Sequence, residues 1–180
     1  MKNDVIALGE LLIDFTENGT SEHGNAVFEA NPGGAPCNVL AMLSKLGRKT
    51  AFIGKVGNDM FGRQLAETIR EAGISDEGLV YDDNVSTTLA FVHTLEGGER
   101  EFSFVRNPGA DMMLTADEVN CTIIKESGIF HFGTLSCTHE GVRRATELAV
   151  ETAVNSGAVI SFDPNLREPL WKSLDEAHEQ

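Results

Sequence analysis

Short apolar runs alternate regularly with longer amphipathic segments along this chain. Three of the amphipathic segments show helical periodicity and stop just before a glycine, where a left-handed C-cap residue is expected. Strands that alternate with helices in this way predict a parallel β-sheet covered by helices. The expected strands are Val5–Leu8, Ala51–Val56, Ile129–Phe132 and Val159–Phe162, and the expected helices are Pro36–Leu46, Phe61–Ala72 and Glu140–Ser156, followed by Gly47, Gly73 and Gly157.

Two stretches interrupt this alternation, and both are typical of antiparallel β-structure. In the first, two apolar runs flank a polar loop, and in the second a glycine-containing turn, Glu96–Glu99, joins β-branched and aromatic runs. Neither stretch can belong to a purely parallel sheet, so we expect the segments 11–31 and 86–107 to form a small antiparallel β lid beside the core. The expected strands are Leu11–Phe15 with Val27–Glu29, and Thr87–Leu95 with Arg100–Val105.

The charge of the chain limits its partners. The 180 residues include 14 Lys and Arg against 28 Asp and Glu, a net charge of −14. This charge opposes binding to nucleic acids and to anionic membranes. The length favours one domain, at about 150 residues per domain. Asp4, Glu10 and Asp14 within the first fifteen residues fit neither a signal peptide nor a membrane span, so we expect a cytoplasmic protein.

Cysteine and histidine residues give no sign of a metal centre or a disulfide scaffold. The three cysteines include no C-x-x-C pair, and the five histidines lack metal-ligand spacing. We therefore expect free thiols and no metal site built from these residues.

The segment Asn31–Asn38 places Gly33 and Gly34 directly before a helix. Glycines there let a ligand approach the backbone, the helix start supplies N–H donors, and the Asn38 amide can both donate and accept. Such a site suits polyol hydroxyls, but a glycine turn in which Asn38 satisfies local backbone explains the pattern equally well. Asp14, at the end of a β-run, could bind neighbouring hydroxyls or could be a solvated strand-end residue.

Three later residues are further candidates. Phe104 and Arg106 are two positions apart near the end of a lid strand, so they are expected to share a face and to offer an aromatic group and a donor. The alternative is a surface arginine lying over a core phenylalanine. Arg167 follows a strand at its carboxyl end, where open α/β sheets bind ligands, and its guanidinium suits a phosphate. It could equally pair with Glu168 or cap a helix.

The segment Gly54–Gly62 follows a strand and opens a helix, but it matches neither the P-loop pattern nor the Rossmann pattern G-x-G-x-x-G. Asp59 is well placed as an N-cap, which favours a structural turn.

Taken together, these segments resemble the ribokinase-like (PfkB-type) carbohydrate kinases over the whole chain. The pattern G-G-A-P-x-N at Gly33–Asn38, with Gly47 and Gly57 downstream, keeps the spacing of the first signature of the family. Three features are most similar to bacterial fructokinases: the G-G-A-P-x-N form of this pattern, the run Arg106–Asp111 and the run Asp163–Arg167. Leu40 departs from the signature, which has a small residue there, and only local repacking is expected from it.

The resemblance implies a Rossmann-type three-layer α/β/α sandwich and ATP-dependent phosphorylation of D-fructose to fructose 6-phosphate with Mg²⁺. It also implies a lid that closes over the sugar and that could pair two subunits into a homodimer. The implied sugar-binding residues are Asp14, Gly33, Gly34, Asn38, Phe104 and Arg106, and the residues implied to face the phosphates are Asn165 and Arg167.

The second signature of the family, D-T-x-G-A-G-D, which supplies the catalytic base and an anion hole, is absent from the sequence. The N-x-x-E segment near the metal is missing as well, since the run Asn165–Glu168 has this spacing but stands in the wrong context. The chain also stops within its alternating pattern. We therefore expect the N-terminal part of a sugar kinase, truncated, with its catalytic base beyond Gln180 and no activity of its own. Two alternatives stay open: a 2-keto-3-deoxygluconate kinase or other PfkB-type sugar kinase, and a non-catalytic sugar-binding or dimerisation module.

Overall fold

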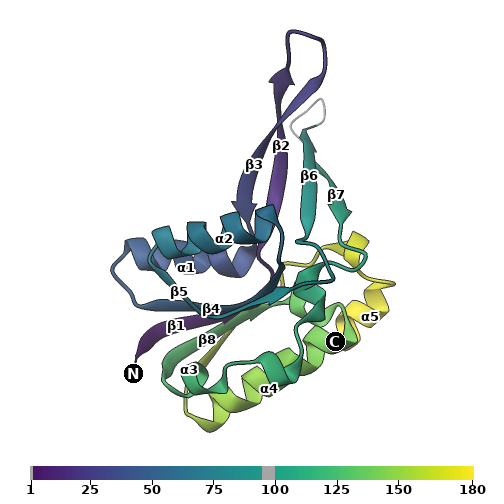
Figure 1. The fold of residues 1–180 in the computed structure, drawn as a ribbon. Coiled ribbons are helices and arrows are strands. Elements are labelled where there is room, and N and C mark those ends of the chain that lie inside the picture. The colour runs from purple at the N-terminus through teal and green to yellow at the C-terminus, as the bar shows by residue number, and fades with distance from the viewer. Residues whose placement is uncertain (1, 95–99) are drawn as a thin grey trace.

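A five-stranded parallel sheet forms the centre of the computed structural model, which describes residues 2–94 and 100–180 (Figure 1). Helices cover both faces of this sheet, and a smaller four-stranded sheet rises from one end of it. The strand order is β5-β4-β1-β8-β9. The bounds are β1 Asn3–Leu8, β4 Thr50–Gly57, β5 Ile74–Asp82, β8 Ser127–Gly133 and β9 Val159–Asp163.

Successive residues of the central strand β1 point to opposite faces of the sheet and enter two separate cores. Ile6 and Leu8 pack in the core beneath α3 (Cys121–Lys125) and α4 (Glu140–Asn155). Val5 and Ala7 pack in the core beneath α1 (Ala35–Lys45) and α2 (Met60–Glu71). Because both faces are covered, the sequence of this strand is continuously apolar rather than alternating. The three-layer arrangement expected from the sequence is confirmed.

The glycines that were expected to end the helices do so. Gly47, Gly73 and Gly157 have φ angles of 78°, 78° and 81°, a left-handed conformation that costs glycine little. None of the helices in residues 2–94 and 100–180 has the length and apolar character needed to cross a membrane. The remaining helical elements are α5 (Leu174–Glu179) and four short 3₁₀ turns, η1 Ala110–Met113, η2 Ala116–Glu118, η3 Thr134–Cys137 and η4 Glu168–Leu170.

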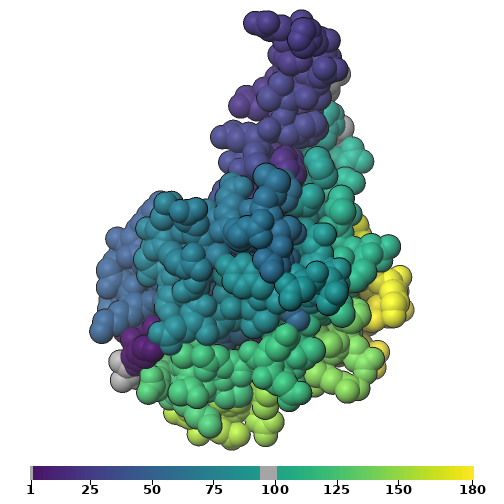
Figure 2. Space-filling view, in the orientation of Figure 1, coloured from purple at the N-terminus to yellow at the C-terminus, as the bar shows by residue number. Residues whose placement is uncertain are grey.

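The small sheet has the order β3-β2-β6-β7, and Figure 2 shows it standing out from the body of the molecule. The pairs β2–β3 and β6–β7 are antiparallel, as expected, but β2 and β6 pair in parallel. This differs from a purely antiparallel lid because β2 and β6 both leave the large sheet at the carboxyl ends of its strands. The expected turn at Glu96–Glu99 lies outside the described residues. The bounds are β2 Leu12–Thr20, β3 Ala26–Gly33, β6 Leu89–Thr94 and β7 Arg100–Val105.

Asp59 caps helix α2 and also ties it to the small sheet. Its side chain accepts hydrogen bonds from the Gly62 N–H at 2.8 Å, from the Thr87 N–H at 2.8 Å and from the Thr87 hydroxyl at 2.8 Å. The structural turn predicted for Gly54–Gly62 is therefore confirmed, since both oxygens of the Asp59 carboxylate accept hydrogen bonds from the protein.

Candidate functional site

A pocket of about 130 Å³ lies where β1, β8 and β9 end, at the foot of the small sheet. The loops after these strands supply Glu10, Leu135, Asn165 and Arg167, and the remaining walls come from the small sheet and the start of α1. Ligands of open α/β sheets bind at this edge, outside the carboxyl ends of the strands. The volume is below the roughly 300–1,000 Å³ of pockets for drug-sized molecules, so the pocket suits a ligand of monosaccharide size.

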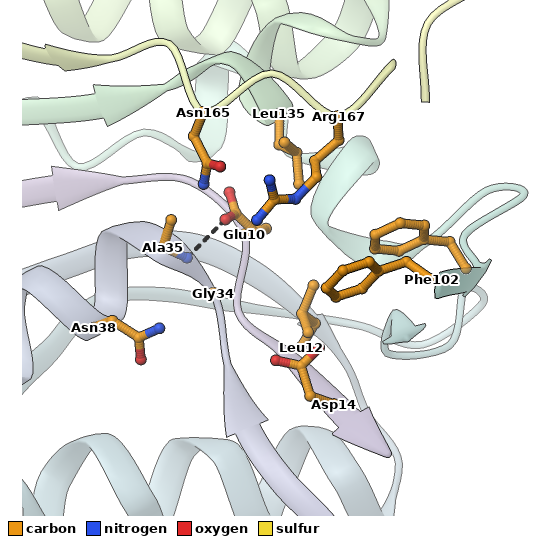
Figure 3. Close-up of a pocket in the computed structure, with 11 residues that line it drawn as sticks. Glu10, Leu12, Asp14, Gly34, Ala35, Asn38, Phe102, Leu135, Asn165 and Arg167 are labelled. Carbon is orange, nitrogen blue, oxygen red and sulfur yellow. Dashed lines mark hydrogen bonds between the residues drawn. The ribbon is translucent and has the colours of Figure 1, made fainter. Parts of the chain in front are cut away.

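Six of the eight candidate residues from the sequence line this one pocket, although they come from distant parts of the chain. Arg167 and Asn165 enter from the β9 loop, opposite the β2 carboxylate, as Figure 3 shows. The two unlike charges, Asp14 and Arg167, therefore share a space bounded by amide groups and aromatic rings. The six residues are Asp14, Gly34, Asn38, Phe104, Asn165 and Arg167.

The two glycines before α1 are required by close packing. A Cβ on Gly33 would collide with the Asp14 carboxylate, and a Cβ on Gly34 would collide with the carbonyl oxygen of Glu10. Gly34 also has φ +121°, which L-residues rarely adopt. Gly33 itself lines a neighbouring apolar cavity of about 230 Å³ together with Cys37 and Asn38. It therefore brings the backbone close to Asp14 rather than facing the first pocket.

The Asp14 carboxylate is half-buried and electrostatically coupled to Arg167. Burial raises its pKa above the ordinary value, and the charge of Arg167 opposes that rise. The Arg167 guanidinium lies 5.6 Å from the centre of the Phe102 ring, which is within range of a cation–π interaction. Arg167 precedes the 3₁₀ turn η4 without capping it through its side chain. Its guanidinium is thus directed to the pocket, and not to the capping role considered as an alternative.

Arg106 does not line this pocket, contrary to the expectation from the sequence. Its guanidinium donates to Asp111 Oδ2 at 2.8 Å, to the Thr138 hydroxyl at 2.9 Å and to the Leu135 carbonyl at 3.1 Å. The side chains of Arg106 and Asp111 are each only 3% exposed. Strand β7 ends one residue earlier, at Val105, so strand alternation no longer fixes the direction of Arg106. The residue supports Leu135, which forms part of the pocket wall.

Five lining residues were not named as candidates from the sequence: Glu10, Leu12, Ala35, Phe102 and Leu135. Phe102 had a signal, since it alternates with Phe104 along β7, and the two rings are stacked with centres 6.1 Å apart. Glu10 lies two residues after the end of β1 and is only 4% exposed. Its Oε1 accepts a hydrogen bond from the Ala35 N–H at 2.9 Å, so this donor at the α1 N-terminus is already paired.

The described residues do not by themselves fit a magnesium site. No group of three or more His, Cys, Asp or Glu side chains within residues 2–94 and 100–180 could hold a metal ion. Mg²⁺ is commonly held by one or two carboxylates together with substrate phosphates, so its binding would depend on the nucleotide.

Comparison with known proteins identifies the family. The family model for pfkB family carbohydrate kinase matches residues 2–180. The chain belongs to the pfkB family of carbohydrate kinases. It is 49% identical over 178 residues to fructokinase-1 of Zea mays, covering 98% of this chain and 55% of that protein.

Solved structures agree with this assignment. A fructokinase from Xylella fastidiosa superposes with a TM-score of 0.89 at 35% identity, covering 95% of this chain and 53% of that one. A structure of fructokinase from the same organism with bound ATP gives a TM-score of 0.87 at 34% identity, covering 95% and 51%. The ribokinase-like fold expected from the sequence is therefore confirmed, and this pfkB chain spans about half the length of these relatives.

Proposed function

We propose that this protein is an ATP-dependent fructokinase, which converts D-fructose to fructose 6-phosphate, and that the 180 residues supply most of its sugar site. The observation that carries the proposal is the single pocket in which the Asp14 carboxylate and the Asn38 amide face Arg167. A carboxylate and an amide suit sugar hydroxyls, and a guanidinium suits a phosphate. The family membership and the fructokinases among its relatives support the same substrate.

Each side of the pocket has its own role in this proposal. Asp14 accepts hydrogen bonds from the sugar, and the Asn38 amide donates to it and accepts from it. Gly34 lets the sugar approach the backbone, Gly33 leaves room for the Asp14 carboxylate, and the Phe104 ring covers an apolar face of the sugar. Asn165 and Arg167 contact the transferred phosphate. The small sheet acts as a lid, and water excluded by it cannot compete with the sugar hydroxyl for the phosphate.

The transfer step needs groups that this sequence does not contain. A general base and an anion hole are required, and the D-T-x-G-A-G-D run that provides them in the family is absent. We therefore expect these 180 residues to bind sugar without turning it over. Mg²⁺, when bound with ATP, would neutralise the phosphate charge. We also propose that the protein acts in the cytoplasm.

The geometry disfavours the keto-acid alternative in the form considered from the sequence. A 2-keto-3-deoxygluconate kinase would need a cation for the substrate carboxylate, and Arg106 was the residue expected to supply it. The Arg106 guanidinium is instead buried against Asp111, Thr138 and Leu135.

One observation favours pairing of subunits through the small sheet. Phe15 and Phe91 stack on the face away from the pocket, with ring centres 5.1 Å apart, and Phe28 packs edge-on against Phe91. Phe28 is 41% exposed and the neighbouring Val27 is 39% exposed. This aromatic face suits a homodimer contact, whether the protein is a kinase or a non-catalytic sugar-binding module.

The deciding experiment compares ADP release by this chain and by the product of the complete reading frame, each with fructose, ATP and Mg²⁺. Activity in the longer product, abolished by Asp14→Asn, supports the proposal. Fructose binding without turnover in both products favours the binding module. Turnover of 2-keto-3-deoxygluconate in preference to fructose refutes the assigned substrate.

A further inference from the structure

Glu10 is a buried carboxylate at the edge of the pocket that the proposed function does not use. It is 4% exposed, and Oε1 accepts a hydrogen bond from the Ala35 N–H. The other carboxyl oxygen, Oε2, forms no hydrogen bond with any described side chain. In Figure 3 the side chains of Glu10, Asn165 and Arg167 converge on the same space.

A carboxylate at this place is costly for the fold. Burial raises the pKa of Glu10 to about 7, although the N–H groups of Glu10 and Ala35 act against the rise; the nearby Asp111 adds to it and Arg106 reduces it. Glutamine would accept the same hydrogen bond from Ala35 without any charge. The contact with α1 therefore does not explain why an ionisable group stands there.

We propose that Glu10 is a further sugar-binding residue, whose Oε2 accepts a hydrogen bond from a sugar hydroxyl while Oε1 fixes the start of helix α1. The inference rests on the proposed function, because it assumes a sugar in this pocket. Under this proposal two carboxylates, Glu10 and Asp14, determine the specificity for the sugar. A sugar that lacks the contacted hydroxyl would leave a buried carboxylate unpaired, which discriminates strongly against such analogues.

The other charged or ionisable groups around Glu10 bear on its behaviour with pH. Asp111 and Arg106 form a buried ion pair behind Leu135. The Cys37 thiol is buried, and its pKa is raised by burial and by the charge of Glu10. Arg167 enters the same space as Glu10 from the β9 loop, and Asp14 lies on the opposite side of the pocket. Burial raises the pKa of Glu10 to about 7, so its loss of a proton falls within an experimentally accessible pH range.

The test is calorimetric titration of fructose into Glu10→Gln and into the wild-type product of the complete reading frame, between pH 6 and 8.5. A hydrogen bond to a charged group contributes about 1.5–3 kcal/mol, so we expect binding at pH 8.5 to weaken by about 10–100-fold. Below pH 7 the wild-type side chain becomes neutral, and the two proteins should converge. Glu29→Gln, an exposed carboxylate on β3, is the matched control and should behave as wild type.

Monodeoxy analogues of fructose identify the contact. The analogue that lacks the hydroxyl facing Glu10 should bind wild type no better than Glu10→Gln, whereas the others should retain the preference for wild type. Equal affinities and pH profiles for the two proteins would overturn the role of Glu10 alone. Absence of fructose binding by wild type would overturn the proposed function itself.

Discussion

Replacing Glu10 by glutamine should stabilise the fold, and by an amount that depends on pH. The ordinary pKa of this carboxyl is 4.5, and in the folded protein it is raised to about 7. Between these two values the folded state binds a proton that the unfolded state has lost. The free energy of unfolding therefore falls by about 1.4 kcal/mol for each pH unit, and the total loss is about 3 kcal/mol above pH 7.

Glutamine does not titrate and keeps an oxygen for the Ala35 N–H. The stability of Glu10→Gln relative to wild type should thus be near zero at pH 4.5 and rise to about 3 kcal/mol at pH 8. Urea unfolding followed by circular dichroism at several pH values, on dilute protein, measures this difference. Glu29→Gln, the same substitution at an exposed carboxyl, serves as control.

The result that refutes this reasoning is a difference between Glu10→Gln and wild type that is constant across the pH range, or one that shrinks as pH rises. A constant difference would mean that folding leaves the pKa of Glu10 at its ordinary value, and a shrinking difference would mean that folding lowers it. In either case the carboxylate would be better solvated or better paired than the 4% exposure of Glu10 indicates.

Three other perturbations test separate parts of the structure. Asp111→Ala should destabilise the protein by about 3–5 kcal/mol in a thermal melt, because it leaves the Arg106 guanidinium buried without its partner; replacing both residues by apolar ones should cost less. Gly34→Ala should cost at least about 1 kcal/mol and abolish fructose binding in calorimetry, because φ is +121° and the new Cβ meets the Glu10 carbonyl. The edge strand β9 exposes Phe162 (51%), so Phe162→Lys should reduce concentration-dependent association measured by light scattering, and an unchanged mass profile would count against that edge.

The sequence predicted the layers of the fold well because they depend on local signals. The apolar runs of β1 and β4 and the glycines after the helices mark element ends with little help from tertiary contacts. The parallel pairing of β2 with β6 could not be predicted, since it joins residues about 75 positions apart, such as Asp14 and Ala90. Which strands of the small sheet become neighbours depends on how both hairpins leave the large sheet.

The site was predicted where strand ends place side chains, and missed where burial decides their role. Arg167 follows the rule for carboxyl ends of strands, whereas Asp14 is the third residue of β2 rather than its end, and both line the pocket. Arg106 was misplaced because it stands just beyond β7 and finds Asp111 five residues later. Glu10 was missed because an acidic residue after a strand is usually solvated. The contacts of Glu10 with Gly34 and Ala35, which depend on the fold, are what enclose this residue.

The two experiments on Glu10→Gln together separate a structural role from a binding role. If Glu10 served only to fix the start of α1, a substitution that disturbed this contact would weaken stability and sugar binding in the same direction. If instead the buried carboxylate is held for the ligand, the substitution should raise stability above pH 7 and weaken binding over the same range. Opposite signs at one position are expected where a protein keeps a destabilising group for its function. Equal signs would reduce Glu10 to a support for the helix.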